Sequence, residues 1–125
     1  MKLKAEELKQ FDENGYIIIP ELFSSDEVAV LKGEIPKVFS KRREENVREK
    51  DSDSVRTAFA THTYNEVYRR FVRHPNILGP AKQLLKGEVY VHQFKLNAKA
   101  AFNGEVWQWH QDFGVWHRDD QMPEP

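Results

Sequence analysis

The chain has 125 residues, of which 39% are apolar and 31% charged, the length and composition of one soluble globular domain. Nineteen basic and 20 acidic residues give a net charge of -1, so no overall field attracts nucleic acid or an acidic membrane surface. No uninterrupted apolar run exceeds four residues, which excludes a bilayer-spanning helix and the apolar core of a signal peptide. The absence of cysteine excludes disulfides, thiolate zinc sites and cysteine nucleophiles, so we expect a cytoplasmic protein that uses histidine, carboxylates or a cofactor.

The first predicted element is a short amphipathic helix over residues 3–14. Leu8 and Phe11 are three residues apart among charged side chains, and Gly15 follows as the expected left-handed C-cap. The apolar run at residues 16–19 comes next and predicts a buried strand, which the following proline ends.

A second helix is predicted to begin after Ser24. Ser24 and Glu27 have the spacing of a capping box, and apolar residues follow at helical intervals. Pro36 lies within that pattern and is expected to kink or split the helix near Glu34, because proline removes a backbone donor and crowds the preceding turn. The highly charged segment 41–50 predicts either a solvated extension of the helix or a mobile loop.

The middle of the chain predicts alternating short elements. A short strand is expected over residues 55–60, a helix over residues 64–71 and another short helix over residues 76–86. Residues 88–98 form the longest strand candidate.

Gln93 and Asn97 are polar residues that share one face of this otherwise apolar strand candidate. A buried amide needs a hydrogen-bond partner, and the carboxylate of a cofactor is one candidate. The alternative is that both side chains lie on a solvated face or cap a turn.

The last 25 residues are rich in aromatic side chains, and all three tryptophans lie between positions 107 and 116. Residues 106–112 alternate like a strand, in which residues two apart project from the same face, so His110 and Asp112 are placed to bind one metal ion. An imidazole followed two residues later by a carboxylate is how the 2-His-1-carboxylate triad of non-haem Fe(II) oxygenases begins. The alternative is a surface pair or a hydrogen-bonded core pair without a metal.

Three segments of the chain resemble the phytanoyl-CoA dioxygenase family. Residues 11–20 (FDENGYIIIP), followed by LFS at residues 22–24, resemble the N-terminal signature of the family. Residues 89–97 (VYVHQFKLN) and 107–123 (WQWHQDFGVWHRDDQMP) resemble its branch around the bacterial ectoine hydroxylases.

The resemblance implies an Fe(II)- and 2-oxoglutarate-dependent dioxygenase that hydroxylates a small molecule with dioxygen while 2-oxoglutarate is decarboxylated to succinate. It implies an α+β fold in which N-terminal helices pack on the opening strands of a double-stranded β-helix, or cupin-like jelly roll. Residues 1–125 are then a single incomplete domain, with a mainly helical region at 1–87 and the first core strands at 88–125. No nucleic-acid or membrane partner is expected.

The resemblance also assigns roles to individual residues. The iron ligands are His110 and Asp112, the residues toward 2-oxoglutarate are Asn97, Gln93 and Trp107, and the residue facing the substrate is Trp116. Ectoine hydroxylases typically have Ser, Glu, Thr and Gly where this chain has Gln111, Gly114, Val115 and Gln121, so ectoine is not the expected substrate and a small zwitterionic or amino-acid-like molecule is preferred. The carboxylate of Asp112 favours hydroxylation over halogenation.

The family supplies a second histidine ligand and an arginine for 2-oxoglutarate from strands downstream of the His-x-Asp pair. Only thirteen residues follow Asp112, and His117 is placed beside the substrate loop rather than at the metal. We therefore expect an N-terminal part of a longer protein that is inactive by itself. A non-catalytic binding or interaction module and a vestigial paralogue remain the alternatives.

Overall fold

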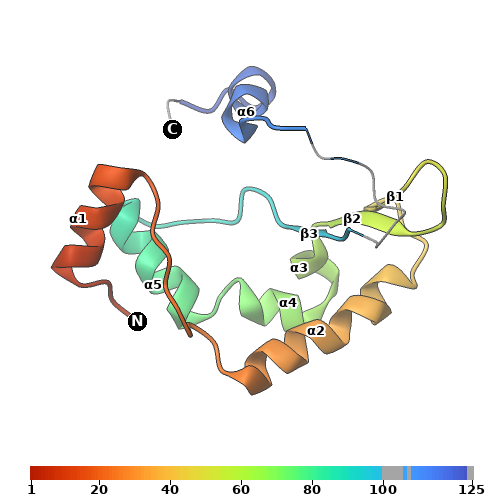
Figure 1. Cartoon of the computed structure of the whole chain (residues 1–125), viewed down its shortest axis with the longest axis horizontal. Coiled ribbons are helices and arrows are strands. Elements are labelled where there is room, and N and C mark those ends of the chain that lie inside the picture. Colours follow the sequence, from red (N-terminus) through yellow and green to blue (C-terminus); the bar gives the residue numbers. More distant parts are fainter. Residues whose placement is uncertain (100–105, 107, 124–125) are drawn as a thin grey trace.

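The computed structural model describes residues 1–99, 106 and 108–123, which form helices around a small antiparallel sheet (Figure 1). In chain order the elements are α1 (Ala5–Asn14), α2 (Ser25–Phe39), β1 (Asn46–Arg48), β2 (Val55–Phe59), α3 (Thr61–Tyr64), α4 (Glu66–Phe71), α5 (Pro75–Leu84), β3 (Lys95–Asn97) and α6 (Asp112–Asp120). This mixture of helix and sheet confirms the predicted α+β class. Among the described residues, no helix has both the length and the apolar character that crossing a bilayer requires.

Helix α1 ends where the sequence predicts. Gly15 adopts the left-handed conformation with φ of 75°, and its N–H donates to the carbonyl of Phe11 at 2.8 Å. The strand predicted at residues 16–19 is wrong: Tyr16 is 59% exposed and Ile18 75% exposed, and the segment joins no ladder of the described sheet. An apolar run forms a strand only when another strand offers it hydrogen-bond partners.

Helix α2 begins with the predicted capping box. The Ser24 hydroxyl accepts from the Glu27 N–H at 3.2 Å, and the Glu27 carboxylate accepts from the Ser24 N–H at 2.8 Å. The predicted split near Glu34 does not occur, since the helix continues through Pro36 to Phe39. Pro36 lies in the last turn, where its missing N–H costs one bond, and its own carbonyl still accepts from Ser40 at 2.9 Å.

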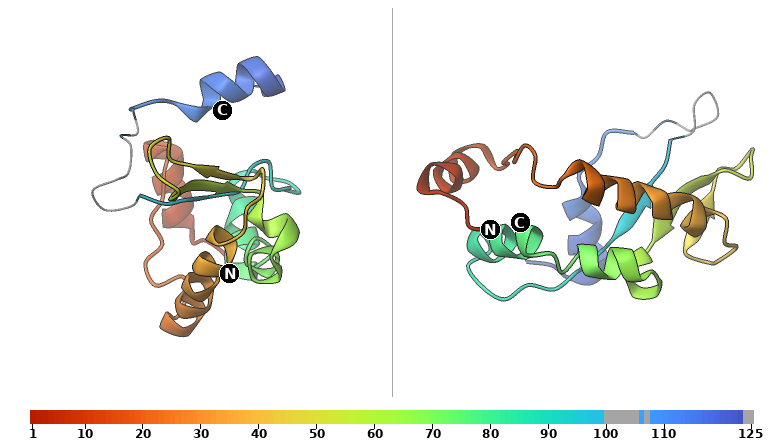
Figure 2. Two further views of the ribbon diagram at one scale, coloured as in Figure 1. Left: turned by 90° about the vertical axis from the view of Figure 1, so that its right-hand side faces the viewer. Right: turned by 90° about the horizontal axis from the view of Figure 1, so that it is seen from below.

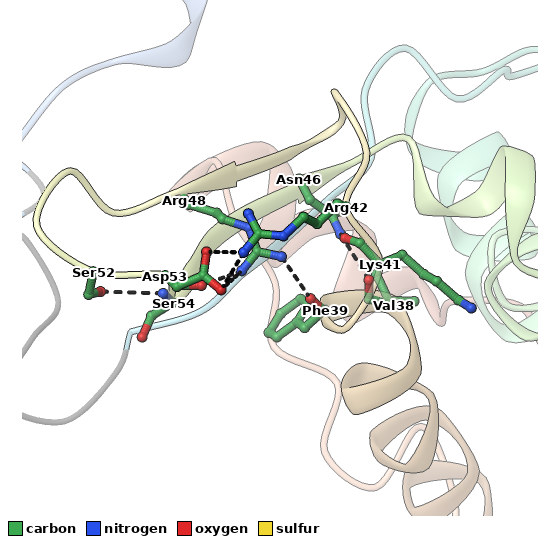
Figure 3. Close-up of polar contacts among 9 residues, drawn as sticks. All are labelled: Val38, Phe39, Lys41, Arg42, Asn46, Arg48, Ser52, Asp53 and Ser54. Carbon is green, nitrogen blue, oxygen red and sulfur yellow. Dashed lines mark hydrogen bonds and ion pairs between the residues drawn. The ribbon is translucent and has the colours of Figure 1, made fainter.

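The charged segment 41–50 is neither a helix extension nor a free loop, because it contains strand β1, which pairs with β2 in an antiparallel hairpin. Polar contacts attach this hairpin to the end of α2 (Figure 3). The buried Asn46 donates from Nδ2 to the carbonyls of Val38 and Lys41, both at 2.8 Å. At the hairpin turn the Asp53 carboxylate accepts from Arg42 through both oxygens at 2.9 Å. Side chains of this segment therefore attach the hairpin to α2 and to its own turn.

The sheet has the order β1-β2-β3, and β3 pairs antiparallel to β2 with Thr57 opposite Asn97. The strand predicted over residues 88–98 is much shorter than expected, since only Lys95–Asn97 is in the ladder. β2 ends at Phe59, which pairs with Lys95, and the adjacent Phe94 carbonyl accepts only one further backbone bond, from the Ala60 N–H at 2.7 Å.

The core lies where α2, β2 and α4 meet. Its buried side chains are Val38, Val55, Ala58 and Tyr68, and the Tyr68 hydroxyl donates to the Leu31 carbonyl of α2 at 2.9 Å. The predicted helix over residues 64–71 is interrupted at Asn65, whose side chain caps α4. Figure 2 shows the sheet between this helical layer and α6. The last helix thus lies on the opposite side of the sheet from the core.

Candidate functional site

His110 and Asp112 lie together at the start of α6. The His110 Nε2 atom is 3.3 Å from Asp112 Oδ1, and both side chains are about half exposed. The backbone is not the predicted strand over residues 106–112: the described residues of that segment are outside any strand, and Asp112 is the first residue of a helix. The predicted proximity of the two side chains is confirmed, but a turn into a helix produces it.

A backbone carbonyl fixes the tautomer of His110. Its Nδ1 atom lies 2.6 Å from the carbonyl oxygen of Gln108. Because a carbonyl oxygen can only accept, Nδ1 carries the proton and donates. In the neutral imidazole Nε2 then keeps its lone pair and faces Asp112. A ring with one N–H bonded to a carbonyl and the other nitrogen free to bind a metal is typical of a metal-ligating histidine.

Asp112 lies at a helix N-terminus and beside a cation. It occupies the first turn of α6, where the partial positive charge of the helix N-terminus favours an anion. Its second oxygen, Oδ2, is 3.8 Å from Lys95 Nζ on β3. One oxygen of Asp112 therefore faces His110 while the other faces Lys95.

This donor set fits part of an iron site. Cis ligands in an octahedral shell with bonds of about 2.1 Å lie about 3.0 Å apart, close to the spacing of the His110 and Asp112 donor atoms. One imidazole and one carboxylate are two of the three protein ligands of the Fe(II) facial triad. In the described ranges no third histidine, aspartate or glutamate joins them to form a metal-binding group of three.

A cavity of about 370 Å³ adjoins Asp112. It is lined by Tyr90, Val91, His92, Gln93, Lys95, Asp112, Trp116 and Met122. Gln93, Asp112 and Trp116, three residues singled out from the sequence for different roles, thus border the same space. Trp109, in contrast, is fully exposed.

The remaining predicted site residues are placed differently. Asn97 is on β3, where its side-chain oxygen accepts from the Thr57 hydroxyl at 3.1 Å, and it does not line this cavity. Trp107 lies outside the described residues. His117 turns toward the end of α6, with Nδ1 2.7 Å from the Met122 carbonyl.

Two residues at the site, His92 and Lys95, received no role from the sequence. The His92 ring packs edge-on against Trp116 with centroids 5.4 Å apart, and its Nε2 is 3.4 Å from Asp120 Oδ2. The sequence analysis predicted no helix after residue 112, and only a helix from Asp112 brings Trp116 and Asp120 onto the same face. The acidic first turn and basic last turn of α6 were the available signal.

A second, larger cavity of about 680 Å³ lies between α4, α5 and residues 89–94. Its lining is mainly apolar and includes Phe71, Leu78 and Phe94. Asp112 is not among its lining residues but borders the smaller cavity, so the candidate chemistry lies at the smaller cavity.

Comparison with known proteins decides the family. Residues 11–124 match the phytanoyl-CoA dioxygenase (PhyH) family. The chain belongs to this family. The resemblance read from the three sequence segments is thereby confirmed.

Relatives in the PhyH family include ectoine dioxygenase of Bordetella parapertussis, which is 38% identical over 125 residues. L-proline trans-4-hydroxylase of Streptomyces griseoviridis is 40% identical over 116 residues. These alignments cover 97% and 93% of this chain but 41% and 43% of the relatives. The chain spans about two fifths of the length of these curated relatives.

The same similarity appears in three dimensions. The crystal structure of EctD from S. alaskensis with 2-oxoglutarate and 5-hydroxyectoine matches with a TM-score of 0.90 at 34% identity. The match covers 97% of this chain and 44% of EctD. A structure of the same protein with bound Fe matches with a TM-score of 0.85.

Proposed function

We propose that this chain carries the first part of the active site of a cytoplasmic Fe(II)- and 2-oxoglutarate-dependent dioxygenase that hydroxylates a small molecule. The observation that carries the proposal is the pair of His110 Nε2 and Asp112 Oδ1 at 3.3 Å, with the tautomer of His110 set by Gln108. The EctD structures with Fe and with 2-oxoglutarate support the choice of metal and co-substrate.

In this proposal the side chains divide the work between the metal, the co-substrate and the substrate. His110 and Asp112 hold the metal, Gln93 and Asn97 face 2-oxoglutarate together with Trp107, and Trp116 faces the substrate. When bound, iron and 2-oxoglutarate supply the oxidising power that inserts an oxygen atom from dioxygen into a C–H bond. The protein side chains bind and orient the reactants.

We infer that the fold of the whole site is a double-stranded β-helix with the N-terminal helices packed on its opening strands. The 0.90 TM-score with EctD over 97% of this chain supports this inference. The triad needs a second histidine and 2-oxoglutarate needs a basic partner. We therefore expect the 125 residues by themselves not to turn over substrate, and the division at residues 1–87 and 88–125 remains a prediction.

The proposed substrate is small and amino-acid-like. The relatives named ectoine dioxygenase and L-proline trans-4-hydroxylase support this class. Ectoine itself is disfavoured, because Gln111, Gly114, Val115 and Gln121 replace the residues typical of the ectoine hydroxylases.

The test is an anaerobic Fe(II) titration, with and without 2-oxoglutarate, of the complete protein that contains these 125 residues. We expect 2-oxoglutarate to tighten iron binding and to produce a weak visible charge-transfer band. His110→Ala should abolish both effects and succinate formation, while His117→Ala, a control at a histidine whose Nδ1 faces the Met122 carbonyl, should retain them. Equal iron affinity with and without 2-oxoglutarate would instead indicate a binding module or a vestigial paralogue.

A further inference from the structure

Three acidic or aromatic residues share one face of α6. Asp112, Trp116 and Asp120 are spaced four residues apart, so their side chains follow one side of the helix. From the first to the last this stripe spans about 12 Å at 1.5 Å per residue. The candidate metal ligand therefore lies at one end of a stripe whose other end is Asp120.

The partners of this stripe come from residues 90–97, on the other side of the cavity. Lys95 Nζ is 3.8 Å from Asp112 Oδ2 at the first end of the stripe. His92 serves the other two positions, with its ring edge-on to Trp116 and its Nε2 3.4 Å from Asp120 Oδ2. Tyr90 in turn packs against His92, with centroids 6.5 Å apart.

A helix contacted at one end can still tilt about that end. His92 contacts α6 one turn and two turns beyond Asp112, so it resists this tilt where Lys95 cannot. α6 has no buried side chain among its described residues, which leaves polar and ring contacts to orient it.

We propose that His92 is a positioning residue for the site. By contacting Trp116 and Asp120 together it fixes the orientation of α6 against residues 90–97, and so places Asp112 and Trp116 at the cavity. The consequence for iron binding rests on the function proposed above, whereas the orientation of α6 does not.

The test uses ¹⁹F NMR of the protein labelled with 5-fluorotryptophan, with the Trp116 signal assigned by Trp116→Phe. His92→Phe keeps a ring beside Trp116 but removes the nitrogen, and Asp120→Asn keeps the shape but removes the charge. Both should shift the Trp116 signal and leave that of the fully exposed Trp109 in place. The matched control is Asp119→Asn, because Asp119 is as exposed as Asp120 but pairs with its neighbour Arg118 at 2.6 Å.

Iron affinity measured with 2-oxoglutarate present should fall about tenfold in His92→Phe and in Asp120→Asn, as for other residues that orient metal ligands. The double variant should lose no more than either single variant, because the two residues act through one contact. His92→Gln, which restores a donor, should recover part of the affinity.

The outcomes distinguish the positioning role of His92 from the proposed dioxygenase function. A Trp116 signal that is equally unmoved in Asp120→Asn and Asp119→Asn would overturn the positioning role. A moved signal with unchanged iron affinity would also overturn it, provided that iron binding by the unsubstituted protein depends on 2-oxoglutarate. If the unsubstituted protein shows no dependence of iron binding on 2-oxoglutarate, while Asp120→Asn alone moves Trp116, the dioxygenase proposal fails and the orientation of α6 by His92 stands.

Discussion

The region around α2, β2 and α4 and the region around α6 are built in different ways. In the first, Val38, Val55, Ala58 and Tyr68 are buried together, and a hydrogen bond from Tyr68 to Leu31 joins α4 to α2. In the second, Trp109 is fully exposed and Tyr90 is 82% exposed, and α6 is held by ring and polar contacts at its surface.

This difference assigns the stability of the fold to the first region and the binding chemistry to the second. Burial of apolar surface supplies most of the free energy of folding, so the first region should determine whether the chain folds. The second region contributes few buried contacts, and its side chains are available to bind a metal and small molecules. Substitutions in the first region should therefore lower mainly stability, and substitutions in the second should weaken mainly binding.

The largest expected effect is on the core side of this comparison. Tyr68→Ala removes a side chain that is only 3% exposed and its hydrogen bond to Leu31, and should lower the free energy of unfolding by about 3–5 kcal/mol. Urea denaturation measures the loss. His110→Ala should change the same quantity by no more than about 0.5 kcal/mol, since its side chain is exposed. A comparable loss in both variants would contradict the distinction between a stabilising core region and a binding region.

A smaller loss is expected where the hairpin joins α2. Asn46→Ala leaves the carbonyls of Val38 and Lys41 without the donor they share, so unfolding should become easier by about 1–3 kcal/mol. The thermal midpoint of the variant reports it. Asn14→Ala, at the exposed end of α1, is the control, and an equal shift in both variants would contradict the structural role of Asn46.

The exposed ion pair at the hairpin turn should matter less. Arg42 and Asp53 form a two-oxygen contact at 2.9 Å, but their side chains are 75% and 68% exposed. Asp53→Asn should cost about 0.2–1 kcal/mol in urea denaturation at low salt, and less as salt screens the pair. A loss that persists in 1 M salt would show that the contact is not mainly electrostatic.

The smallest expected effect is on the stability of the fold at acidic pH. Hydrogen bonds from Lys37 and then from Asn65 lower the pKa of Glu34 below its ordinary value. A carboxyl group with a lowered pKa in the folded state stabilises the fold above its unfolded pKa, and this contribution is lost as the pH falls through the folded value. Glu34→Gln should therefore flatten the decline of stability below about pH 4.5. A decline that is equally steep in Glu34→Gln and in the unsubstituted protein would contradict this role of Glu34.

Local signals in the sequence were sufficient where the structure depends on neighbouring residues. The Gly15 C-cap and the Ser24–Glu27 capping box are both confirmed, because each is a contact within one turn. The strand at residues 16–19 and the full strand at 88–98 were wrong, because a strand requires a distant partner that hydrophobic periodicity does not reveal. For the same reason the charged sequence of β1 gave no sign of its pairing with β2.

The site shows the same limit. His110 and Asp112 are close together as predicted, since two residues of separation keep them near in either backbone conformation. The contacts of His92 and Lys95 depend on α6 folding back over residues 90–97, which no local pattern contains. The roles of His110, Asp112, Gln93, Asn97, Trp107 and Trp116 in binding stay predictions.

The most direct test of the central claim is an anomalous difference map at the iron edge, from crystals of the gene product grown anaerobically with Fe(II) and 2-oxoglutarate. The account predicts a single iron peak within about 2.0–2.2 Å of His110 Nε2 and of an Asp112 carboxylate oxygen. A map without a peak at this pair, or with iron bound by His92 and Asp120 instead, would contradict it.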